Sequence, residues 1–446
     1  MAASTGGDGG PRVGSDRSAT GPWFGRFWAA SAVSDLGTYV TVVAVPVLVL
    51  KTMGGSATDV GLVSAARWLP YLLFGVLVGV LVDRARRRPL LVATDGGRGA
   101  LLVLVPLLAY LGVLGVPLLA VLMAAFGMLS LVGDAAHQSF LPRLVPRPGL
   151  ALANSRLEGT AAVAQTAGPA LGGTLVAVLG APVAIIADAV SYLVSAVLLV
   201  GVRVAEPPPP ARPERGRRGA ALWAELREGL RWVYRHRTLM PLAVSTHVWF
   251  LFFSVLNTAY PVLVLRGLEL GALDFGLTLA LGGVGALAGA VASTRVCTRL
   301  GVVRTVAGAH LTQAAGFAVV AATLLPGDRG RIAQVALLAA GQFLVGLGMG
   351  VEGPITMSYR QGVTPDRLQG RMNTTMRSVN RAVVVVGAPL GGLLVDSAGF
   401  AVTMVAGVTG LVVGAVVVLA SPLRHARTDD DPETHPVPPG SPEPVG

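Results

Sequence analysis

The sequence has little charge, one cysteine and one lysine. Of its 446 residues, 53% are hydrophobic and only 13% are charged, and the mean hydropathy is +0.66. Soluble proteins carry about 25% charged residues, so this composition excludes a water-soluble chain and indicates a polytopic membrane protein. Because Cys297 is the single cysteine, no disulfide can form within the chain.

The usual patterns of metal, nucleotide and catalytic sites are also missing. The six histidines are scattered without metal-ligand spacing, so we expect no metal and no cofactor. No Gly-x-x-x-x-Gly-Lys motif for nucleotide phosphates occurs, and no cluster of His and acid residues suggests an enzyme. The net charge of +11 would suit nucleic acid. The arginines, however, are spread among short connecting segments, which indicates membrane topology and no nucleic-acid partner.

Long apolar runs fill most of the chain. A transmembrane helix needs about 20 mostly apolar residues, and twelve runs qualify. An even number of spans places both termini on the same side of the membrane. The runs begin near Phe24, Asp59, Pro89, Val116, Leu150, Ala181, Thr238, Leu273, Val302, Arg331, Leu368 and Phe400.

The arginines predict which side of the membrane that is. A tight loop after the second run holds Arg84, Arg86, Arg87 and Arg88, and most other basic residues lie in segments on the same side. Such basic loops stay in the cytoplasm. We therefore expect a multi-pass plasma-membrane protein with both termini in the cytoplasm. The usage, rich in Arg, Ala and Val, indicates a bacterial source.

The two halves of the chain resemble each other. Seven residues between Pro146 and Gly180 recur 219 residues later, between Pro365 and Gly399. A parallel repeat of two six-span halves is the layout of a transporter whose halves rock about a central site. The chain is predicted to begin with a disordered cytoplasmic N-terminus (1–22) and a six-helix bundle (23–203). A cytoplasmic linker (204–237), a second six-helix bundle (238–421) and a disordered cytoplasmic tail (422–446) follow.

The linker is predicted to hold one regular element. It opens with four prolines at 207–210, which favour an extended chain. Between Ala220 and Arg235, apolar residues are spaced among Arg and Glu as in an amphipathic helix. Such a helix either lies on the inner membrane surface or packs on the cytoplasmic loops, and the sequence leaves both arrangements open.

The loop after the second run carries a family resemblance. It resembles the pattern Gly-x-Leu-x-Asp-Arg-x-Gly-Arg-Arg of the major facilitator superfamily, except that Arg86 replaces the second glycine. This resemblance implies an all-α membrane fold with twelve transmembrane helices in two six-helix bundles. The segment reads Gly79-Val-Leu-Val-Asp83-Arg84-Ala-Arg86-Arg87-Arg88.

A second pattern resembles the Gly-Pro-x-x-Gly-Gly motif of drug–proton antiporters. Four further segments, which begin at Ser34, Ala66, Asp188 and Glu228, resemble enterobactin exporters and macrolide-efflux proteins. The resemblance implies proton-coupled export of a small organic molecule, such as an antibiotic, a drug or a siderophore-like compound. The motif itself reads Gly168-Pro169-Ala-Leu-Gly172-Gly173.

The loop residues Gly79, Asp83, Arg84, Arg87 and Arg88 are predicted to form a cytoplasmic gate. A carboxylate gains about 0.3–1 kcal/mol at a helix N-terminus, so we expect Asp83 to latch the start of the eleventh run when the cytoplasmic side is closed. The arginines would hold the loop to acids and lipid phosphates. A simple stop-transfer cluster would explain the arginines but not the acid.

Ionisable residues inside spans are costly and are therefore functional candidates. At 1.5 Å per residue, Asp35 and Arg67 lie about 16 Å and about 12 Å from the starts of their spans, which is near the midplane for both. We expect them to pair, so that Asp35 takes up a proton when the arginine moves away. A static pair between the first two spans is the alternative. Asp188, which has no evident partner, is the second proton candidate.

Small residues predict close helix contacts. We expect the antiporter-like glycines to meet Gly282, Gly283, Gly285 and Gly289, and Gly75 and Gly79 to meet Gly387. Asp95 and Arg98, three residues apart, are expected to pair. The cavity candidates are polar residues within spans, and their low charge favours an amphipathic substrate, although the arginines would favour an anionic one. They are Tyr39, Gln165, His247, Asn257, Gln313, Asn380, Arg377 and Arg381.

Together these patterns predict a monomeric secondary transporter that contacts membrane lipids and exports a small molecule against protons by alternating access. Uptake by the same fold is one alternative, and only the antiporter-like motif separates it from export. A non-transporting membrane receptor or scaffold is an alternative of another class.

Overall fold

A computed structural model describes residues 21–83, 85–204, 218–327 and 329–422. For Val76, Val80, Asp83 and residues 218–226 it describes the backbone alone. Throughout these ranges the regular structure is helical and contains no β-strand. The predicted all-α membrane fold is confirmed.

The helices follow one another with short connections. The N-terminal half comprises α2 (Phe24–Val47), η1 (Leu48–Thr52), α3 (Ala57–Asp83), α4 (Arg87–Tyr110), α5 (Val116–Leu144), η2 (Arg147–Gly149), α6 (Leu150–Leu179) and α7 (Ala181–Val200). The linker holds α8 (Arg218–Arg235). The C-terminal half comprises α9 (Leu239–Val262), η3 (Leu263–Gly267), α10 (Ala272–Ala321), η4 (Ala322–Leu324), α11 (Arg331–Gly362) and α12 (Asp366–Leu419).

Nine helices of the described ranges are long and apolar enough to cross a membrane. Two of them are divided into two rods by a glycine in the left-handed region, α10 at Gly301 (φ 77°) and α12 at Gly399 (φ 81°). Glycine adopts this conformation without steric cost. The breaks lie between the predicted eighth and ninth runs and between the eleventh and twelfth. The count of twelve spans stays a prediction.

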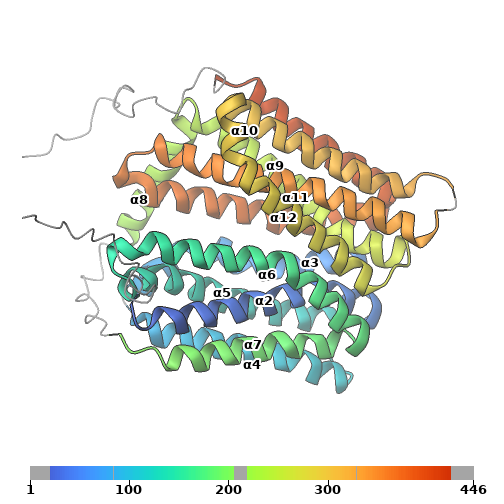
Figure 1. The fold of residues 1–446 in the computed structure, drawn as a ribbon, viewed down its shortest axis with the longest axis horizontal. Coiled ribbons are helices and arrows are strands. Elements are labelled where there is room, and N and C mark those ends of the chain that lie inside the picture. Colours follow the sequence, from blue (N-terminus) through green and yellow to red (C-terminus); the bar gives the residue numbers. More distant parts are fainter. Residues whose placement is uncertain (1–20, 84, 205–217, 328, 423–446) are drawn as a thin grey trace, which may run out of the picture.

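The two halves form two layers (Figure 1), with α2 to α7 in one and α9 to α12 in the other. We call the end at which α3 ends and α4 begins the basic end, after Arg86, Arg87 and Arg88. The far end is the opposite one, where η1 and η3 lie. The linker helix α8 lies at the basic end (Figure 1).

The halves touch toward the far end along two pairs of helices, α3 with α12 and α6 with α10. A Cβ on Gly61 of α3 would strike the backbone of Ala388, and one on Gly392 of α12 would strike the start of α3. Gly173 of α6 and Gly276 of α10 face each other in the same way. Glycine at these positions lets the helix backbones approach closely.

Several predicted glycine contacts are wrong. Gly387 packs on Ser254 and Leu251 of α9, while Gly75 and Gly79 of α3 face open space. Along α3 the contact with α12 therefore lies at Gly61, about four helical turns nearer the far end than Gly75, where the sequence spacing had placed it.

The glycines of the antiporter-like motif also have other partners than predicted. Gly168 and Gly172 pack on Tyr39 and Val40 of α2, so they join helices within one half. Gly283 reaches α6, but at Thr166 and not at a glycine of the motif. Three neighbouring glycines of α10 pack on α11 instead. They are Gly282, Gly285 and Gly289. A helix has several faces, and the sequence alone did not show which face each glycine occupies.

A carboxylate from one half caps a helix of the other half. Asp396 of α12 accepts hydrogen bonds from the backbone N–H of Ala57 (3.2 Å) and Thr58 (2.8 Å) and from the Thr58 hydroxyl (2.7 Å). The next amide, that of Asp59, donates to the Ser56 hydroxyl (3.1 Å). The first three amides of α3 are thereby satisfied, two of them from across the seam. We call the contact of Asp396 with Ala57 and Thr58 the far-end latch.

A second polar contact closes the far end. Arg266 of η3 donates to the carbonyl oxygen of Leu50 in η1 at 2.9 Å. The two π-helical turns have nearly the same sequence, Pro46-Val-Leu-Val-Leu-Lys51 and Pro261-Val-Leu-Val-Leu-Arg266. This second internal repeat was missed in the sequence, although its 215-residue offset is visible there.

The linker helix packs on the C-terminal half. Glu228 forms ion pairs with Arg367 and Arg371 at the start of α12. Trp232 donates to the Thr364 hydroxyl (3.3 Å), and Val233 is buried in a small apolar cluster with residues of α9 and α12. The described part of α8 therefore follows the second of the two predicted arrangements, packing on the protein at the basic end.

We predict that Gly229→Leu releases α8 from α12. A side chain at this position would strike the backbone of Arg371 and the Thr375 hydroxyl. Hydrogen–deuterium exchange should show amides of residues 227–235 exchanging at least about tenfold faster than in the wild type, because local opening sets this rate. Arg231→Leu, an exposed position on the same helix, is the matched control. Unchanged exchange in Gly229→Leu would contradict the packing.

Candidate functional site

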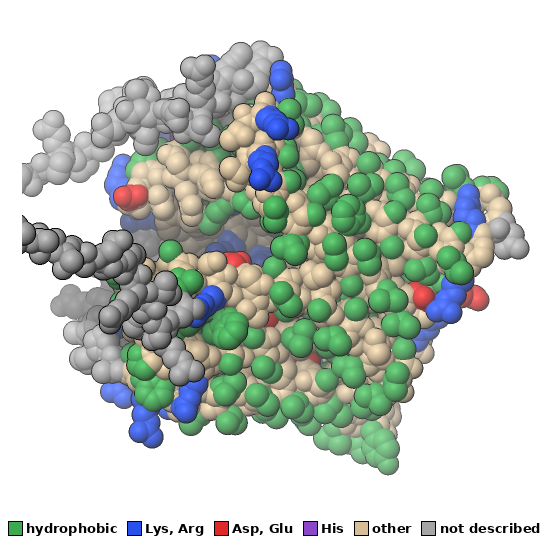
Figure 2. Space-filling model, viewed as in Figure 1, with side chains coloured by type: hydrophobic (Ala, Val, Ile, Leu, Met, Phe, Trp, Pro, Cys, Tyr) green, Lys and Arg blue, Asp and Glu red, His purple; other side chains and the backbone are tan. Residues whose placement is uncertain are grey.

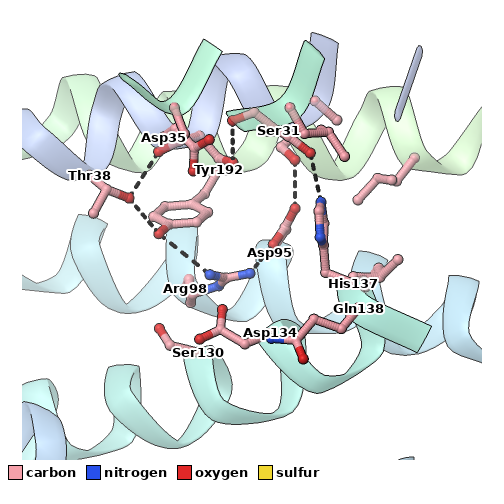
Figure 3. Close-up of a pocket in the computed structure, with 18 of the residues that line it drawn as sticks. Ser31, Asp35, Thr38, Asp95, Arg98, Ser130, Asp134, His137, Gln138 and Tyr192 are labelled. Carbon is pink, nitrogen blue, oxygen red and sulfur yellow. Dashed lines mark hydrogen bonds and ion pairs between the residues drawn. The ribbon is translucent and has the colours of Figure 1, made fainter. Parts of the chain in front are cut away.

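A cavity of about 370 Å³ lies in the N-terminal half, among α2 to α7. Its lining comes mainly from the parts of these helices nearer the basic end, and Figure 2 shows the surface hollowed between the two halves at that end. Polar side chains converge inside it (Figure 3). The charged residues and the histidine of its lining are Asp35, Arg67, Asp95, Arg98, Asp134, His137 and Glu158.

The charge of this lining is unbalanced. It contains four carboxylates and two arginines. Carboxylates in a low-dielectric interior are stable only when a cation or a proton compensates them. The excess of acids therefore favours uptake of a proton or of a cationic ligand, which differs from the anionic preference expected from the arginines.

The predicted pair of Asp95 and Arg98 is confirmed. The Arg98 guanidinium donates to Asp95 and to the Tyr192 hydroxyl (3.4 Å), and it lies 4.5 Å from the Tyr192 ring centre. Asp95 also accepts from the Ser195 hydroxyl (2.6 Å). These contacts join α4 to α7 and form one wall of the cavity (Figure 3).

The predicted pair of Asp35 and Arg67 is wrong, although both residues line the cavity. Among the described residues, no ion pair joins them. The Arg67 guanidinium instead lies 5.2 Å from the ring centre of Phe126 and 5.7 Å from that of Trp68. Asp35 is half-buried and faces the cavity (Figure 3). Its carboxylate is therefore open to a proton or a ligand.

Asp188 has partners that its position in the sequence did not reveal. It is fully buried between α7 and α2, where it accepts hydrogen bonds from the hydroxyls of Thr41 and Ser191. Gly37 leaves room for it, because a Cβ there would strike the carboxylate. Asp188 is not part of the cavity lining, so its described contacts join helices within the N-terminal half.

The gate loop is described only in part. The side chain of Asp83 and all of Arg84 lie outside the description. Arg88 donates to the carbonyl oxygens of Leu199 (3.3 Å) and Val200 at the end of α7, so this arginine caps a helix of its own half. Arg87 is buried at the start of α4.

Arg381 crosses from one half to the other. Its guanidinium carbon lies 3.8 Å from the ring centre of Trp68 and 5.5 Å from that of Tyr71, both on α3. The Tyr71 hydroxyl donates to Asp134 at 2.7 Å. Trp68, Tyr71 and Asp134 all line the cavity. Arg381, predicted as a cavity residue, therefore contacts α3 at the edge of the cavity.

The other cavity candidates have diverse environments. His247 lies between the Tyr234 hydroxyl (2.7 Å) and Asn380 (2.8 Å), and so joins α8, α9 and α12. Gln313 is fully buried in a network with Trp249 and Glu352 in the C-terminal half. None of these is in the cavity lining described above. The same holds for Tyr39, whose side chain packs against Gly168, for Gln165 on α6, and for Asn257 and Arg377, which are exposed.

Several functional candidates were missed in the sequence, notably Tyr71, His137 and Tyr192. A signal for them was present, because polar residues recur every three or four positions in otherwise apolar runs, as Ser31, Ser34 and Thr38 do on α2. That period places them on one helix face.

No group of three or more His, Cys, Asp or Glu in the described ranges is placed to hold a metal ion.

The fold is shared with solved transporter structures. A bacterial homologue of the iron transporter ferroportin in an inward-facing state has a TM-score of 0.69 at 15% identity, over 89% of this chain and 98% of that one. The nucleoside transporter NupG has a TM-score of 0.70 at 9% identity, over 90% and 99%. At such identities the likeness concerns the fold.

Sequence relatives extend over most of the chain. The multidrug efflux pump Tap of Mycobacterium tuberculosis (strain ATCC 25618 / H37Rv) is 30% identical over 388 residues, which cover 84% of this chain and 88% of the relative. The macrolide efflux protein A of Streptococcus pyogenes is 24% identical over 251 residues, or 54% and 58%. A sequence model of the family described as transmembrane secretion effector matches residues 20–443.

The two halves of apolar helices, the family model and the efflux-pump relative together define a transporter of the major facilitator superfamily. Within it the chain belongs to the transmembrane secretion effector family, whose model covers nearly its whole length. The superfamily predicted from the loop and motif residues is confirmed.

We predict that Asp95→Ala destabilises the N-terminal half. Arg98 would keep its charge in a buried site without its carboxylate partner, which costs about 3–5 kcal/mol. The melting temperature of the purified protein in detergent should therefore fall by several degrees. Asp366→Ala, an exposed acid at the start of α12, is the control. Equal melting temperatures of the two variants would contradict this assignment.

Proposed function

We propose that the protein is a proton-coupled exporter of small organic, drug-like molecules. The single observation that supports it most is the cavity of excess carboxylates at the end where the two halves are apart. The names of the relatives, a multidrug efflux pump and a macrolide efflux protein, favour drugs as the substrates. In this proposal the chain works as a monomer and crosses the plasma membrane twelve times.

We assign the basic end to the cytoplasm. Arginines gather there on the α3–α4 loop, on α8 and at the start of α12, and basic segments are retained inside the cell. Both termini then lie in the cytoplasm. The far end, closed by the far-end latch and by Arg266, faces outward. The described conformation is therefore the inward-open one, in which a substrate from the cytoplasm reaches the cavity.

Asp35 is the proposed proton carrier. It faces the cavity without an ion pair in the described part of the chain, and Asp134 and Glu158 line the same cavity. A carboxylate among other carboxylates binds a proton readily, because protonation removes the mutual repulsion. When a cation or a rearranged arginine supplies positive charge instead, the proton is released. This exchange is what coupling of export to proton entry requires.

Asp83 is the proposed counterpart of Asp396 in the outward-open state. Helix α3 and the first rod of α12 run in opposite directions, so the end of each is directed toward the side of the molecule where the other begins. Asp396, near the end of that rod, caps the start of α3. Asp83 ends α3, and we assign it to the start of α12 when the basic end closes. Asp396 caps α3 only when the far end is closed, and Asp83 caps α12 only when the basic end is closed. Because the two ends close in turn, the two caps exclude each other.

Inverted membrane vesicles distinguish export from uptake. With the cytoplasmic face outward and the lumen acidified, an exporter should accumulate a fluorescent drug inside, because protons leaving the lumen drive the drug inward. Accumulation only in right-side-out vesicles would indicate uptake. Drug binding without accumulation in either preparation would indicate a receptor or scaffold.

We predict that Asp35→Asn abolishes proton-driven accumulation, at least about tenfold, because the amide has no titrating proton. Drug exchange in the absence of a proton gradient should persist, since the cavity itself is kept. Glu269→Gln, which removes an exposed acid outside the cavity and away from the start of α12, should transport like the wild type. Full proton-driven transport by Asp35→Asn would refute the carrier role.

A further inference from the structure

The contact of Arg381 with Trp68 and Tyr71 is unusual, because a cation from the C-terminal half fills an aromatic site of the N-terminal half. The rings of Trp68 and Tyr71 lie 5.3 Å apart and are inclined by 57°. They come from neighbouring turns of α3, and both line the cavity. The Arg381 guanidinium carbon lies closest to Trp68, at 3.8 Å. Two inclined rings beside one cation form an aromatic clamp.

The surroundings of the clamp also suit a positive charge. The Tyr71 hydroxyl is bound to the Asp134 carboxylate at 2.7 Å, which makes the ring richer in electrons. In the described part of the chain, no carboxylate forms an ion pair with Arg381. Its guanidinium is therefore held mainly by the two rings, with Asp134 behind them.

We propose that Trp68, Tyr71 and Asp134 form a subsite for a planar organic cation, and that the Arg381 side chain occupies this subsite while no substrate is bound. The inference rests on the proposed function in one respect, namely that this cavity is the transport cavity. A substrate with a delocalised positive charge displaces Arg381, since both require the same ring faces. Displacement also breaks a contact between the two halves, so binding acts on their relative movement.

The chemistry explains why an arginine holds this place. A guanidinium is planar and only weakly hydrated, so it leaves water and covers an aromatic face at less cost than an ammonium. Cation–π contacts are worth about 0.5–1 kcal/mol when exposed and about 2 kcal/mol when desolvated. That range is strong enough to keep the clamp filled and weak enough for a substrate to replace the arginine.

Ethidium, a planar fluorescent cation, tests the subsite with the full-length protein in lipid nanodiscs. Arg381→Gln should bind ethidium about fivefold to thirtyfold more tightly than the wild type, because the cation nearest the Trp68 ring is gone and Arg67 lies farther from it, at 5.7 Å. Arg381→Lys should lie between the two. Arg377→Gln removes a charge one turn earlier on α12, at an exposed position, and should change the affinity by less than about twofold. Neutral phenanthridine should bind all four proteins equally.

The background Trp68→Leu separates displacement from a general charge effect. There, Arg381→Gln should no longer tighten ethidium binding, since the contested ring is absent. The proposal is overturned if Arg381→Gln leaves the affinity unchanged or lowers it, if it tightens binding equally without Trp68, or if no variant binds ethidium saturably. Transport is measured separately in inverted vesicles, so tight binding without transport would contradict the exporter and leave the subsite standing.

Discussion

One carboxylate joins the two halves of this transporter by capping a helix to which it does not belong. Asp396 satisfies the first amides of α3 from across the seam, where those amides would otherwise lack partners in their own half. Glycines at Gly61 and Gly392 allow the backbones to approach closely enough for this bond. Because the contact sits at the far end, it closes that end and leaves the cavity reachable from the basic end.

In our proposal, the opposite directions of α3 and α12 make this local bond one of two alternating contacts. A pair of antiparallel helices has two places where the end of one meets the start of the other. Asp396 occupies the first, and in our proposal Asp83 occupies the second. Between them, Arg381 on α12 reaches Trp68 on α3 at the cavity edge. One helix pair thus carries the far-end latch, the proposed gate at the basic end and, in our proposal, a contact that a bound cation breaks.

The sequence predicted the class of fold well, because the length and spacing of apolar runs follow directly from the thickness of the membrane. It also located the breaks at Gly301 and Gly399. It predicted side-chain partners poorly. Asp35 and Arg67 have similar depths in the membrane, but depth does not show the direction in which a side chain points, and Arg67 turned to aromatic rings. Partners across the seam, such as Asp396 and Thr58, are hundreds of residues apart and share no local pattern.

Distances between spin labels at both ends of the molecule, with Cys297 replaced by Ser, test this alternation. One pair joins Lys51 and Glu269 at the far end, and the other joins Arg86 and Arg367 at the basic end. Double electron–electron resonance should give a short far-end and a long basic-end distance in the resting protein. Asp396→Asn should populate molecules in which the far-end distance is longer and the basic-end distance is shorter. If the far-end distance does not respond, or if both distances lengthen together, the two ends do not alternate and Asp396 is not the gate.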